Sequence, residues 1–329
     1  MATLRFLSRA EVVQALPMAD AIEGMKSAYA QLSSGQADMP LRARVAGNNE
    51  GVSLVMPAHL KQSGDMGVKI VSVFPNNPSR NLPIIHALVL ALDPETGQPL
   101  ALFEGGSLTA IRTGAGAGAA TDILARQDSS VAAIIGSGIQ ARTQLEAVCT
   151  ARKIEHAYVY SPNRAHAERF AAEMAGVGVM PATISVTDTP EDAIREADIV
   201  CAATTSKTPV FDGTQIRPGT HINGVGSFMP EMIEFDAATL TQSLIVVDQR
   251  EAMLEEAGEI LAAMASGALQ ESDIHAELGE IINGSKTGRT SDEQVTFFKS
   301  VGVAVQDAIS AWVALRNAEA NNIGTMLEM

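Results

Sequence analysis

A glycine-rich turn near the middle of the chain is the clearest chemical signal in the sequence. The segment GSGIQA runs from Gly136 to Ala141, after the apolar run VAAII, and leads into the helical run ARTQLEAVCTA. In such a turn Gly136 permits the tight bend, Gly138 lets the backbone approach a pyrophosphate, and Ala141 allows close helix packing. The amino end of the helix attracts the anion. The pattern predicts a dinucleotide site that includes Ile139 and Gln140, with a ligand-free turn as the alternative.

The residues that follow the next predicted strand bear on the choice of nicotinamide cofactor. NAD sites usually place Asp or Glu there to bind the ribose 2′-hydroxyl. This chain has Ser161, Asn163 and Arg164 instead, which would accept a 2′-phosphate that a carboxylate would repel. The sequence therefore favours NADP(H), with NAD(H) possible, and a merely solvated Arg164 is the alternative. Two further predicted strands end at small residues that we expect to bind the cofactor: Ala203 and Thr204, in its adenine or ribose groove, and Val225.

Cationic residues in the first third of the chain could bind an acidic substrate. Lys69 stands inside the apolar run GVKIVSV, where burial without a partner is costly, so it predicts a charge partner or a catalytic role. Arg42 and Arg112 lie near the ends of predicted elements. Arginine suits bidentate binding of a carboxylate, although a lone arginine is more often a surface residue. His86, in the run IIHALVLAL, is a candidate proton donor, with a satisfied core histidine as the alternative.

Two different kinds of structure must position these residues. In the first third, the patterns predict strands over 67–74, 84–92 and 99–104, joined by a Pro-rich loop and the turn DPETG. This meander predicts a mixed or antiparallel sheet. Residues 108–125 then have a helical pattern, and the glycines inside it are expected to let the helix pack tightly against a neighbour.

From residue 131 onward, predicted strands alternate with helical stretches. The strands are expected at 131–135, 157–160, 184–186, 199–203, 222–225 and 244–247. Such alternation is typical of a doubly wound parallel sheet. The segment 292–317 contains one long apolar helix with Trp312, which we expect to return to the first domain. The predicted fold class is α/β: a Rossmann doubly wound parallel sheet over 116–304, plus a second α+β domain formed by 1–115 and 305–329.

Composition and net charge exclude several classes of protein. The chain has 329 residues, a net charge of −15 and 46% hydrophobic residues, which excludes global disorder and disfavours binding to nucleic-acid phosphates. No apolar run is long enough for a membrane helix, and from the first residues we expect no secretory signal. Cys149 and Cys201 are the only cysteines and the six histidines are scattered, so neither a disulfide framework nor a metal site is expected. We expect a cytoplasmic protein with a small-molecule partner and no nucleic-acid or membrane partner.

Three segments together resemble the ornithine cyclodeaminase and μ-crystallin family. They are GVKIVSVFP around Lys69, LFEGGSLTAIRTGAGAGAATDILA around Arg112, and AIIGSGIQAR around the glycine-rich turn. The resemblance extends from MPLRARV to FKSVG, nearly the whole chain. It implies a Rossmann domain joined to a substrate domain that is built from both chain ends and forms a homodimer. It also implies that Arg42, Lys69 and Arg112 hold the substrate carboxylate, and that Thr113 contacts a cofactor phosphate.

Two positions depart from the cyclodeaminases of this family. Those enzymes carry an aspartate where this chain has Phe228, and a glutamate just before an L-M-P segment where this chain reads SLVMP, with Leu54 as its second residue. The aspartate activates the substrate amine, and an aliphatic residue such as Leu54 cannot bind an amino group. The resemblance therefore favours the reductase branch of the family, with Phe228 as an apolar wall beside the substrate ring.

The resulting hypothesis is an NAD(P)H-dependent reductase that converts 1-pyrroline-2-carboxylate or 1-piperideine-2-carboxylate to L-proline or L-pipecolate. Arg112, with Arg42, would hold the carboxylate and fix the imine carbon. Lys69 would hydrogen-bond the carboxylate or the imine nitrogen, and His86 or a water held by it would deliver the proton. Three alternatives remain: an alanine-dehydrogenase-like or iminosuccinate-type enzyme that needs ammonia, an ornithine cyclodeaminase, and a non-catalytic nicotinamide-dependent binding protein.

Overall fold

The described part of the chain folds into two compact units. The structure is a computed structural model, and it describes residues 3–329. Unit 1 combines the described residues up to Arg112 with the carboxyl-terminal segment Val303–Met329, and unit 2 is the continuous segment Thr113–Gly302. Helix α3 (Gly105–Leu124) contains the first boundary. Unit 1 is therefore assembled from both ends of the chain, and unit 2 from its middle.

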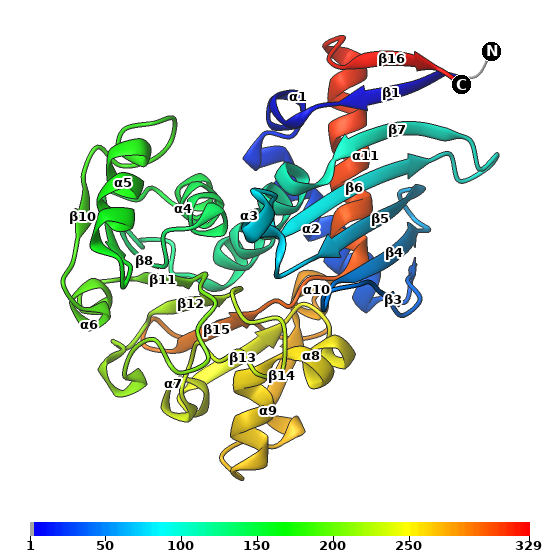
Figure 1. Cartoon of the computed structure of the whole chain (residues 1–329). Helices are drawn as coiled ribbons and strands as arrows, with labels where there is room; N and C mark the ends of the chain where they lie inside the picture. Colours follow the sequence, from blue (N-terminus) through cyan, green and yellow to red (C-terminus); the bar gives the residue numbers. More distant parts are fainter. Residues whose placement is uncertain (1–2) are drawn as a thin grey trace. The chain divides into compact units, whose positions relative to one another are not determined.

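Unit 1 is built on a mixed sheet (Figure 1). Its eight described strands run in the order β16-β1-β7-β6-β5-β4-β2, with β3 paired to β4. Only β1 and β7 pair in parallel. The strands are β1 Thr3–Leu7, β2 Ala37–Asp38, β3 Ala43–Ala46, β4 Val52–Leu60, β5 Asp65–Val73, β6 Ile85–Leu92, β7 Pro99–Glu104 and β16 Thr325–Glu328. The expected meander is confirmed as β5, β6 and β7, and the loop before β6 carries a short 3₁₀ turn, η1 Asn77–Arg80.

A long carboxyl-terminal helix covers one face of this sheet. The helices of unit 1, besides the start of α3, are α1 Arg9–Ala15, α2 Met18–Ser33 and α11 Ala304–Ala320. Helix α11 packs on β4, β5 and β6, with α2 beside it. A Cβ on Gly67 of β5 would lie 3.0 Å from the carbonyl oxygen of Leu90 on β6 and in ordinary contact, 3.5 Å, with Cα of Ala308. Trp312 of α11 donates from Nε1 to the carbonyl oxygen of Met66 at 2.9 Å, which fixes the helix against β5.

Unit 2 is the predicted doubly wound parallel sheet (Figure 1). Its eight described strands run in the order β10-β9-β8-β11-β12-β15-β13-β14, and every neighbouring pair is parallel. The strands are β8 Val131–Ile135, β9 His156–Tyr160, β10 Ile184–Val186, β11 Ile199–Ala202, β12 His221–Gly224, β13 Ser243–Val247, β14 Ile274–Glu277 and β15 Val295–Lys299. The strand order reverses between β8 and β11, and in such sheets a dinucleotide binds at the carboxyl ends of the strands beside that switch.

Helices and short turns connect the strands of unit 2. The α-helices are α4 Ile139–Ala151, α5 Arg164–Met174, α6 Pro190–Ile194, α7 Ala237–Thr241, α8 Arg250–Glu256, α9 Gly258–Ala265 and α10 Leu278–Ile282. The 3₁₀ turns are η2 Gly213–Gln215 and η3 Glu271–Asp273. These connections return the chain to the start of each parallel strand.

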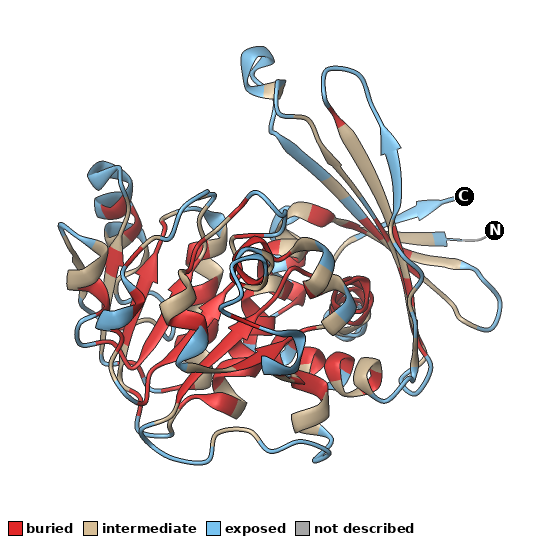
Figure 2. Ribbon diagram, turned by 90° about the horizontal axis from the view of Figure 1, so that it is seen from below, coloured by how far each residue is buried: buried red, intermediate tan, exposed pale blue. Residues whose placement is uncertain are grey.

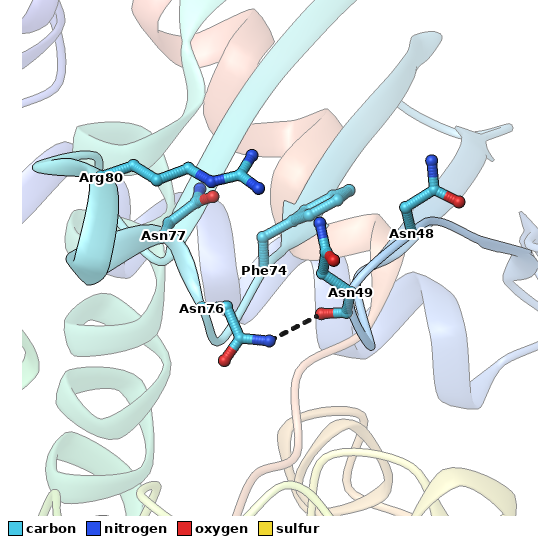
Figure 3. Close-up of a pocket in the computed structure, with 6 residues that line it drawn as sticks. All are labelled: Asn48, Asn49, Phe74, Asn76, Asn77 and Arg80. Atoms are coloured by element: carbon cyan, nitrogen blue, oxygen red, sulfur yellow. Dashed lines mark hydrogen bonds between the residues drawn. The ribbon is translucent and has the colours of Figure 1, made fainter.

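The central strands of unit 2, from β8 to β15 in the sheet order, are almost entirely buried, and Figure 2 shows the middle of this sheet mostly in the colour of buried residues. In β8, Ala133 and Ile135 pack into an apolar cluster with Phe297 of β15, whereas Ile134 packs with Leu145 of α4 on the other face. Parallel strands covered on both sides need apolar residues at every position. This explains why continuous apolar runs, and not alternating ones, mark these strands in the sequence.

The sequence patterns miss two strands of unit 2, β14 and β15. Residues 292–317 do hold the expected helix with Trp312, but this helix, α11, begins only at Ala304, and β15 precedes it. All five residues of β15 are buried. The segment therefore lacks the alternation of apolar and polar residues that indicates a half-buried strand. Its apolar residues cannot be told apart from those of the helix that follows.

Neither a membrane span nor a metal cluster is found in residues 3–329. No helix there is both long enough and apolar enough to cross a membrane. No group of three or more His, Cys, Asp or Glu side chains in that range is placed to hold a metal ion.

Candidate active site

A buried ion cluster forms around Lys69 in unit 1. Lys69 lies on β5 with 3% of its surface exposed, and its ammonium donates to both carboxylate oxygens of Asp307 on α11, at 3.2 and 3.3 Å. Arg112 of α3 donates from Nε to the same carboxylate at 3.1 Å. Asp307 is itself only 1% exposed, so two cations share one buried carboxylate. The charge partner that Lys69 requires is thus supplied from the far end of the chain, by Asp307, which no sequence motif near Lys69 indicates.

The guanidinium of Arg112 is held at two of its three nitrogens. Its Nη1 donates to Gln306 at 2.7 Å, beside the bond from Nε to Asp307. Gln306 is fixed in turn, because it accepts from the N–H of Val303 at 2.9 Å and donates to the Tyr29 hydroxyl at 2.6 Å. Nη2 of Arg112 has no hydrogen-bond partner among residues 3–329. The cluster therefore orients Arg112 and leaves one nitrogen of its fork for a carboxylate ligand.

Burial and charge together set the protonation of Lys69. The pKa of Lys69 is lowered to about 8, chiefly because burial disfavours the ammonium; the charges of Arg112 and Arg42 act in the same direction, and Asp307 opposes them. Arg42, which precedes β3, is therefore close enough for its charge to affect Lys69. A lysine with this pKa is mostly protonated at neutral pH and releases its proton readily, as a general acid must.

The glycine-rich turn of unit 2 has the geometry of a pyrophosphate site. Gly136 adopts a φ of +112°, and a Cβ there would lie 2.7 Å from the carbonyl oxygen of Ala203, so only glycine fits. Gly138 is the N-cap of α4, no side chain caps this helix, and the space for a Cβ on Gly138 is open. A bound pyrophosphate would satisfy the first N–H groups of α4. Ile139 is 68% exposed there, and Oε1 of Gln140 is buried with no partner in the described residues.

Helix α3 packs directly against α4 within unit 2. Gly114 approaches Thr143 so closely that a Cβ on it would lie 2.5 Å from the Thr143 carbonyl oxygen. Gln144 of α4 donates to the carbonyl oxygen of Thr113 at 3.3 Å. A tightly packed glycine in this helix is therefore confirmed at Gly114. Thr113 lies beside α4, and its contact with a cofactor phosphate stays a prediction.

The first residues after β9 lie beside the glycine-rich turn. The N–H of Gly136 donates to the carbonyl oxygen of Tyr160 at 2.9 Å, and Ser137 donates from its hydroxyl to that of Ser161 at 3.1 Å. Asn163 is the N-cap of α5. The structure thus brings Ser161 to the edge of the turn, where the ribose of a dinucleotide is expected.

Arg164, the cation predicted to select the cofactor, is paired with two carboxylates. It donates from Nε to Glu168 at 3.0 Å and from Nη1 to Asp188, and all three side chains are exposed. The hydrogen bond to Glu168 and the charge of Asp188 raise the pKa of Arg164. A 2′-phosphate would have to compete with these carboxylates for the guanidinium.

The predicted groove residues lie at the carboxyl ends of adjacent strands. Ala203 follows β11 and donates from its N–H to Ile135 of β8 at 2.9 Å, and Val225 follows β12 and donates to Ala202 at 3.1 Å. Thr204 is the next residue after Ala203. The structure therefore brings these three residues to the same edge of the sheet as the glycine-rich turn.

Comparison with known proteins identifies the family. The sequence profile of the ornithine cyclodeaminase/mu-crystallin family matches residues 3–322. The chain belongs to this family. The resemblance drawn from the sequence is thereby confirmed over nearly the whole chain.

Members of the family with named activities are similar along their full length. The Delta(1)-pyrroline-2-carboxylate reductase of Bacillus cereus is 38% identical over 313 residues, which cover 94% of this chain and 95% of the relative. The structure of Delta(1)-pyrroline-2-carboxylate reductase from Thermococcus litoralis, in complex with NADH and L-proline, is 43% identical with a TM-score of 0.92, covering 98% and 99% of the two chains. An archaeal alanine dehydrogenase dimer with bound NAD is 36% identical with a TM-score of 0.91, covering 99% of each chain.

Two positions set this family member apart from the pattern expected of cyclodeaminases. In the β4–β5 register Met56 stands opposite Lys69 and Leu54 opposite Val71, so Leu54 and Met56 share a sheet face with Lys69. Phe228 follows β12 in unit 2 and is 41% exposed. Neither Leu54 nor Phe228 offers a carboxylate for a substrate amine.

His86 is not brought to the Lys69 cluster. In the β5–β6 register Lys69 stands opposite Val89, and His86 opposite Ser72. Directly paired residues share a face and successive residues alternate, so His86 projects from the sheet face opposite to Lys69. It is exposed there. The geometry of unit 1 thus argues against His86 as a proton donor beside Lys69 and leaves Lys69 itself as the candidate proton donor of the cluster.

Proposed function

We propose that the protein is an NAD(P)H-dependent reductase of cyclic imino acids, which converts 1-pyrroline-2-carboxylate or 1-piperideine-2-carboxylate to L-proline or L-pipecolate. The observation that carries the proposal is the buried cluster of Lys69, Asp307 and Arg112 on an aliphatic sheet face. This cluster provides positive charge for one carboxylate, and its single acid is already bound by both cations. The Bacillus and Thermococcus relatives, both named Delta(1)-pyrroline-2-carboxylate reductases, support this substrate class.

The residues of unit 1 then have distinct parts in the reaction. Arg112, through Nη2, and Arg42 bind the substrate carboxylate and fix the ring. Lys69 hydrogen-bonds the imine nitrogen and transfers a proton to it, which makes the imine carbon more electrophilic. NAD(P)H, when bound, supplies the hydride that this carbon accepts. Lys69 recovers its proton from solvent, and Asp307 keeps both cations in place throughout.

The assay that tests this function follows nicotinamide oxidation with each cyclic imino acid, in the absence of ammonia. Oxidation at micromolar enzyme supports the proposal, and silence with both rings and both cofactors overturns it. The second candidate is an alanine-dehydrogenase-like activity, which the 36% identity to the archaeal alanine dehydrogenase favours. It predicts oxidation with pyruvate only when ammonia is added.

We infer that NADP(H) is the preferred cofactor, with NAD(H) also accepted. The turn around Gly136 and Gly138 fits the pyrophosphate that both share. Support for NADP(H) comes from the hydroxyl of Ser161 after β9, where a carboxylate would repel a 2′-phosphate, with Asn163 and Arg164 just beyond. The relatives with bound nucleotide carry NADH or NAD, and they support the coarser class.

Asp188 is the residue we expect to limit the use of NADPH. Asp188→Asn frees one side of Arg164 and removes a negative charge near the expected 2′-phosphate. Because an exposed charge pair is worth up to about 1 kcal/mol, we expect KM for NADPH to fall by about fivefold and KM for NADH to change little. Asp128→Asn, which breaks an exposed pair with Arg126, is the control. Equal changes for both cofactors would contradict the assignment.

We infer that the protein is a homodimer that pairs through the open face of the unit 1 sheet. Ile70 and Leu88 stand opposite each other on β5 and β6 and are 49% and 45% exposed. They lie on the face opposite to Gly67 and Lys69, which α11 covers. An exposed apolar patch on a sheet face is typical of an association surface. The alanine dehydrogenase relative is a dimer.

Ile70→Glu tests this surface. It would bury two carboxylates without partners in a symmetric interface, at a cost of several kcal/mol each. We expect the variant to elute as a monomer at micromolar concentration in light scattering, whereas wild type elutes as a dimer. Val13→Glu, on an exposed site of α1, is the matched control and should remain dimeric. A dimeric Ile70→Glu variant would place the interface elsewhere.

A further inference from the structure

A second buried carboxylate joins two loops of unit 2. Glu234 has no exposed surface. Its Oε1 accepts from the N–H of Thr204 at 2.6 Å, and its Oε2 accepts from the N–H groups of Gly226 and Ser227 at 2.7 and 3.1 Å. Burial raises the pKa of Glu234, the charge of Glu259 acts in the same direction, and Lys299 and the hydrogen bonding of Thr204 oppose them. Three N–H donors aimed at one side chain identify it as an acceptor on both oxygens.

The three donors belong to the ends of two adjacent strands. Thr204 lies in the loop 203–206 after β11, and Gly226 and Ser227 lie in the loop 225–229 after β12. We call these the β11 and β12 loops. A Cβ on Gly226 would lie 2.3 Å from the carbonyl oxygen of Thr204 and 2.3 Å from Oε1 of Glu234. The two loops are therefore in such close contact that only glycine fits between them.

A buried ion pair holds the β12 loop from its other side. Lys299, at the end of β15, has no exposed surface and lies 2.7 Å from Oε1 of Glu259. It donates to the carbonyl oxygen of Ser227 at 2.8 Å and to its hydroxyl, which in turn donates to Glu259. Ser227 is thus fixed between Glu234 and Lys299, and the next residue, Phe228, is left partly exposed.

The place of these loops in the sheet points to their role. In a doubly wound sheet, the strands on one side of the switch hold the adenosine half of a dinucleotide and those on the other side hold the nicotinamide half. Here β9, with Ser161, lies on the adenosine side of β8, and β11 and β12 lie on the other side. Glu234 therefore connects the two loops at the nicotinamide half.

We propose that Glu234 is a positioning residue that holds the β11 and β12 loops ready for the nicotinamide ring. This rests on the proposed nicotinamide-dependent function. Glu234 accepts from the backbone N–H groups of both loops, so it acts by fixing Thr204 and the chain that leads to Phe228. A loop pair fixed before binding loses less conformational freedom when the ring binds.

The Glu234→Gln variant separates positioning from folding. Glutamine has one acceptor oxygen, so its amide would face either the Thr204 N–H or the pair on Gly226 and Ser227, and one loop would lose its acceptor. The probes are NADH, followed by nicotinamide fluorescence, and ADP-ribose, which lacks the ring. We expect the Kd for NADH to rise at least about tenfold, as for loss of a buried charge-assisted bond, and the Kd for ADP-ribose to stay within about twofold. We also expect kcat to fall.

Asp198→Asn is the matched control. Asp198 is a buried carboxylate that accepts from the N–H groups of Ser130 and Val131 at 2.9 and 3.1 Å, but at the amino ends of β8 and β11. Its loss should lower the denaturation midpoint and leave both affinities unchanged. The proposal is overturned if Glu234→Gln binds NADH like wild type, or if it loses NADH and ADP-ribose affinity in the same proportion.

Amide hydrogen exchange on the wild-type protein covers the case in which Glu234→Gln does not fold. We expect the N–H groups of Thr204, Gly226 and Ser227 to exchange slowly before any cofactor is added. Exchange as fast as in open loops would overturn the proposal. Apart from kcat, none of these readouts uses an imino acid, so failure of the proposed substrate and failure of the Glu234 assignment are distinguishable.

Discussion

We expect the Lys69→Met variant to lose about 10²–10⁴-fold in kcat, the range in which a positioned general acid contributes. Methionine keeps the length of the side chain and removes the proton, while Arg112 still pairs with Asp307. The Kd for NADH should remain within about twofold of wild type, because the dinucleotide turn belongs to unit 2. Stopped-flow oxidation of the cofactor and fluorescence titration measure the two quantities. Lys61→Met, at an exposed lysine of the same unit, should retain wild-type kcat.

The pH dependence of the wild-type enzyme tests the same assignment. The pKa of Lys69 is lowered to about 8, and the reaction uses the protonated form, so kcat/KM should fall as the pH rises through about 8. In Lys69→Arg the side chain remains charged well above that pH, and this alkaline decline should move upward. A Lys69→Met variant within about threefold of wild type, or a decline that Lys69→Arg leaves in place, would exclude Lys69 as the proton donor.

Sequence patterns predict much of the Rossmann unit because the residues that form each of its elements are neighbours along the chain. The turn at Gly136 depends on residues within one strand, one bend and one helix, and the strand that ends at Ile135 lies where its apolar run predicts. Strand β15 is missed because Phe297 and Phe298 are both buried, in a run that leads into the apolar α11. Periodicity cannot separate a strand covered on both faces from the buried part of a helix.

The site is harder to predict from sequence because its partners are distant along the chain. The requirement that Lys69 have a counter-ion follows from burial alone, but Asp307 is 238 residues away and no local pattern links the two. The one available signal is a single acid in the first turn of an apolar helix. Likewise, the side of the sheet on which His86 projects depends on register, and a shift of one residue would reverse it.

Removal of the shared carboxylate should have the largest effect on stability. In Asp307→Asn, the ammonium of Lys69 and the guanidinium of Arg112 remain buried without a counter-ion. Loss of one partner from a buried ion cluster costs about 3–5 kcal/mol, so we expect the free energy of unfolding to fall by about that amount in denaturant titrations. Glu319→Gln, at an exposed acid of the same helix, should change it by less than about 0.5 kcal/mol.

The Asp307→Asn variant also has a signature that loss of stability alone does not produce. Asp307 raises the pKa of Lys69 against the effect of burial, so without it the pKa falls and Lys69 is less protonated at neutral pH. The alkaline decline of kcat/KM should then move below pH 8 in whatever fraction of the variant is folded. An unchanged profile would mean that Asp307 supports only the fold.

Combining the two substitutions decides whether the cations compete for one carboxylate. In Lys69→Met/Asp307→Asn a single buried cation, Arg112, remains without a counter-ion, and Gln306 still accepts from its Nη1. We therefore expect the double variant to be more stable than Asp307→Asn alone, with a coupling energy in the range of about 0.5–3 kcal/mol for residues in direct contact. Simple additivity in the denaturation midpoints would contradict a shared counter-ion. A measurable coupling would establish that Asp307 holds Lys69 and Arg112 together, as the proposed function requires if both are to act on the same substrate molecule.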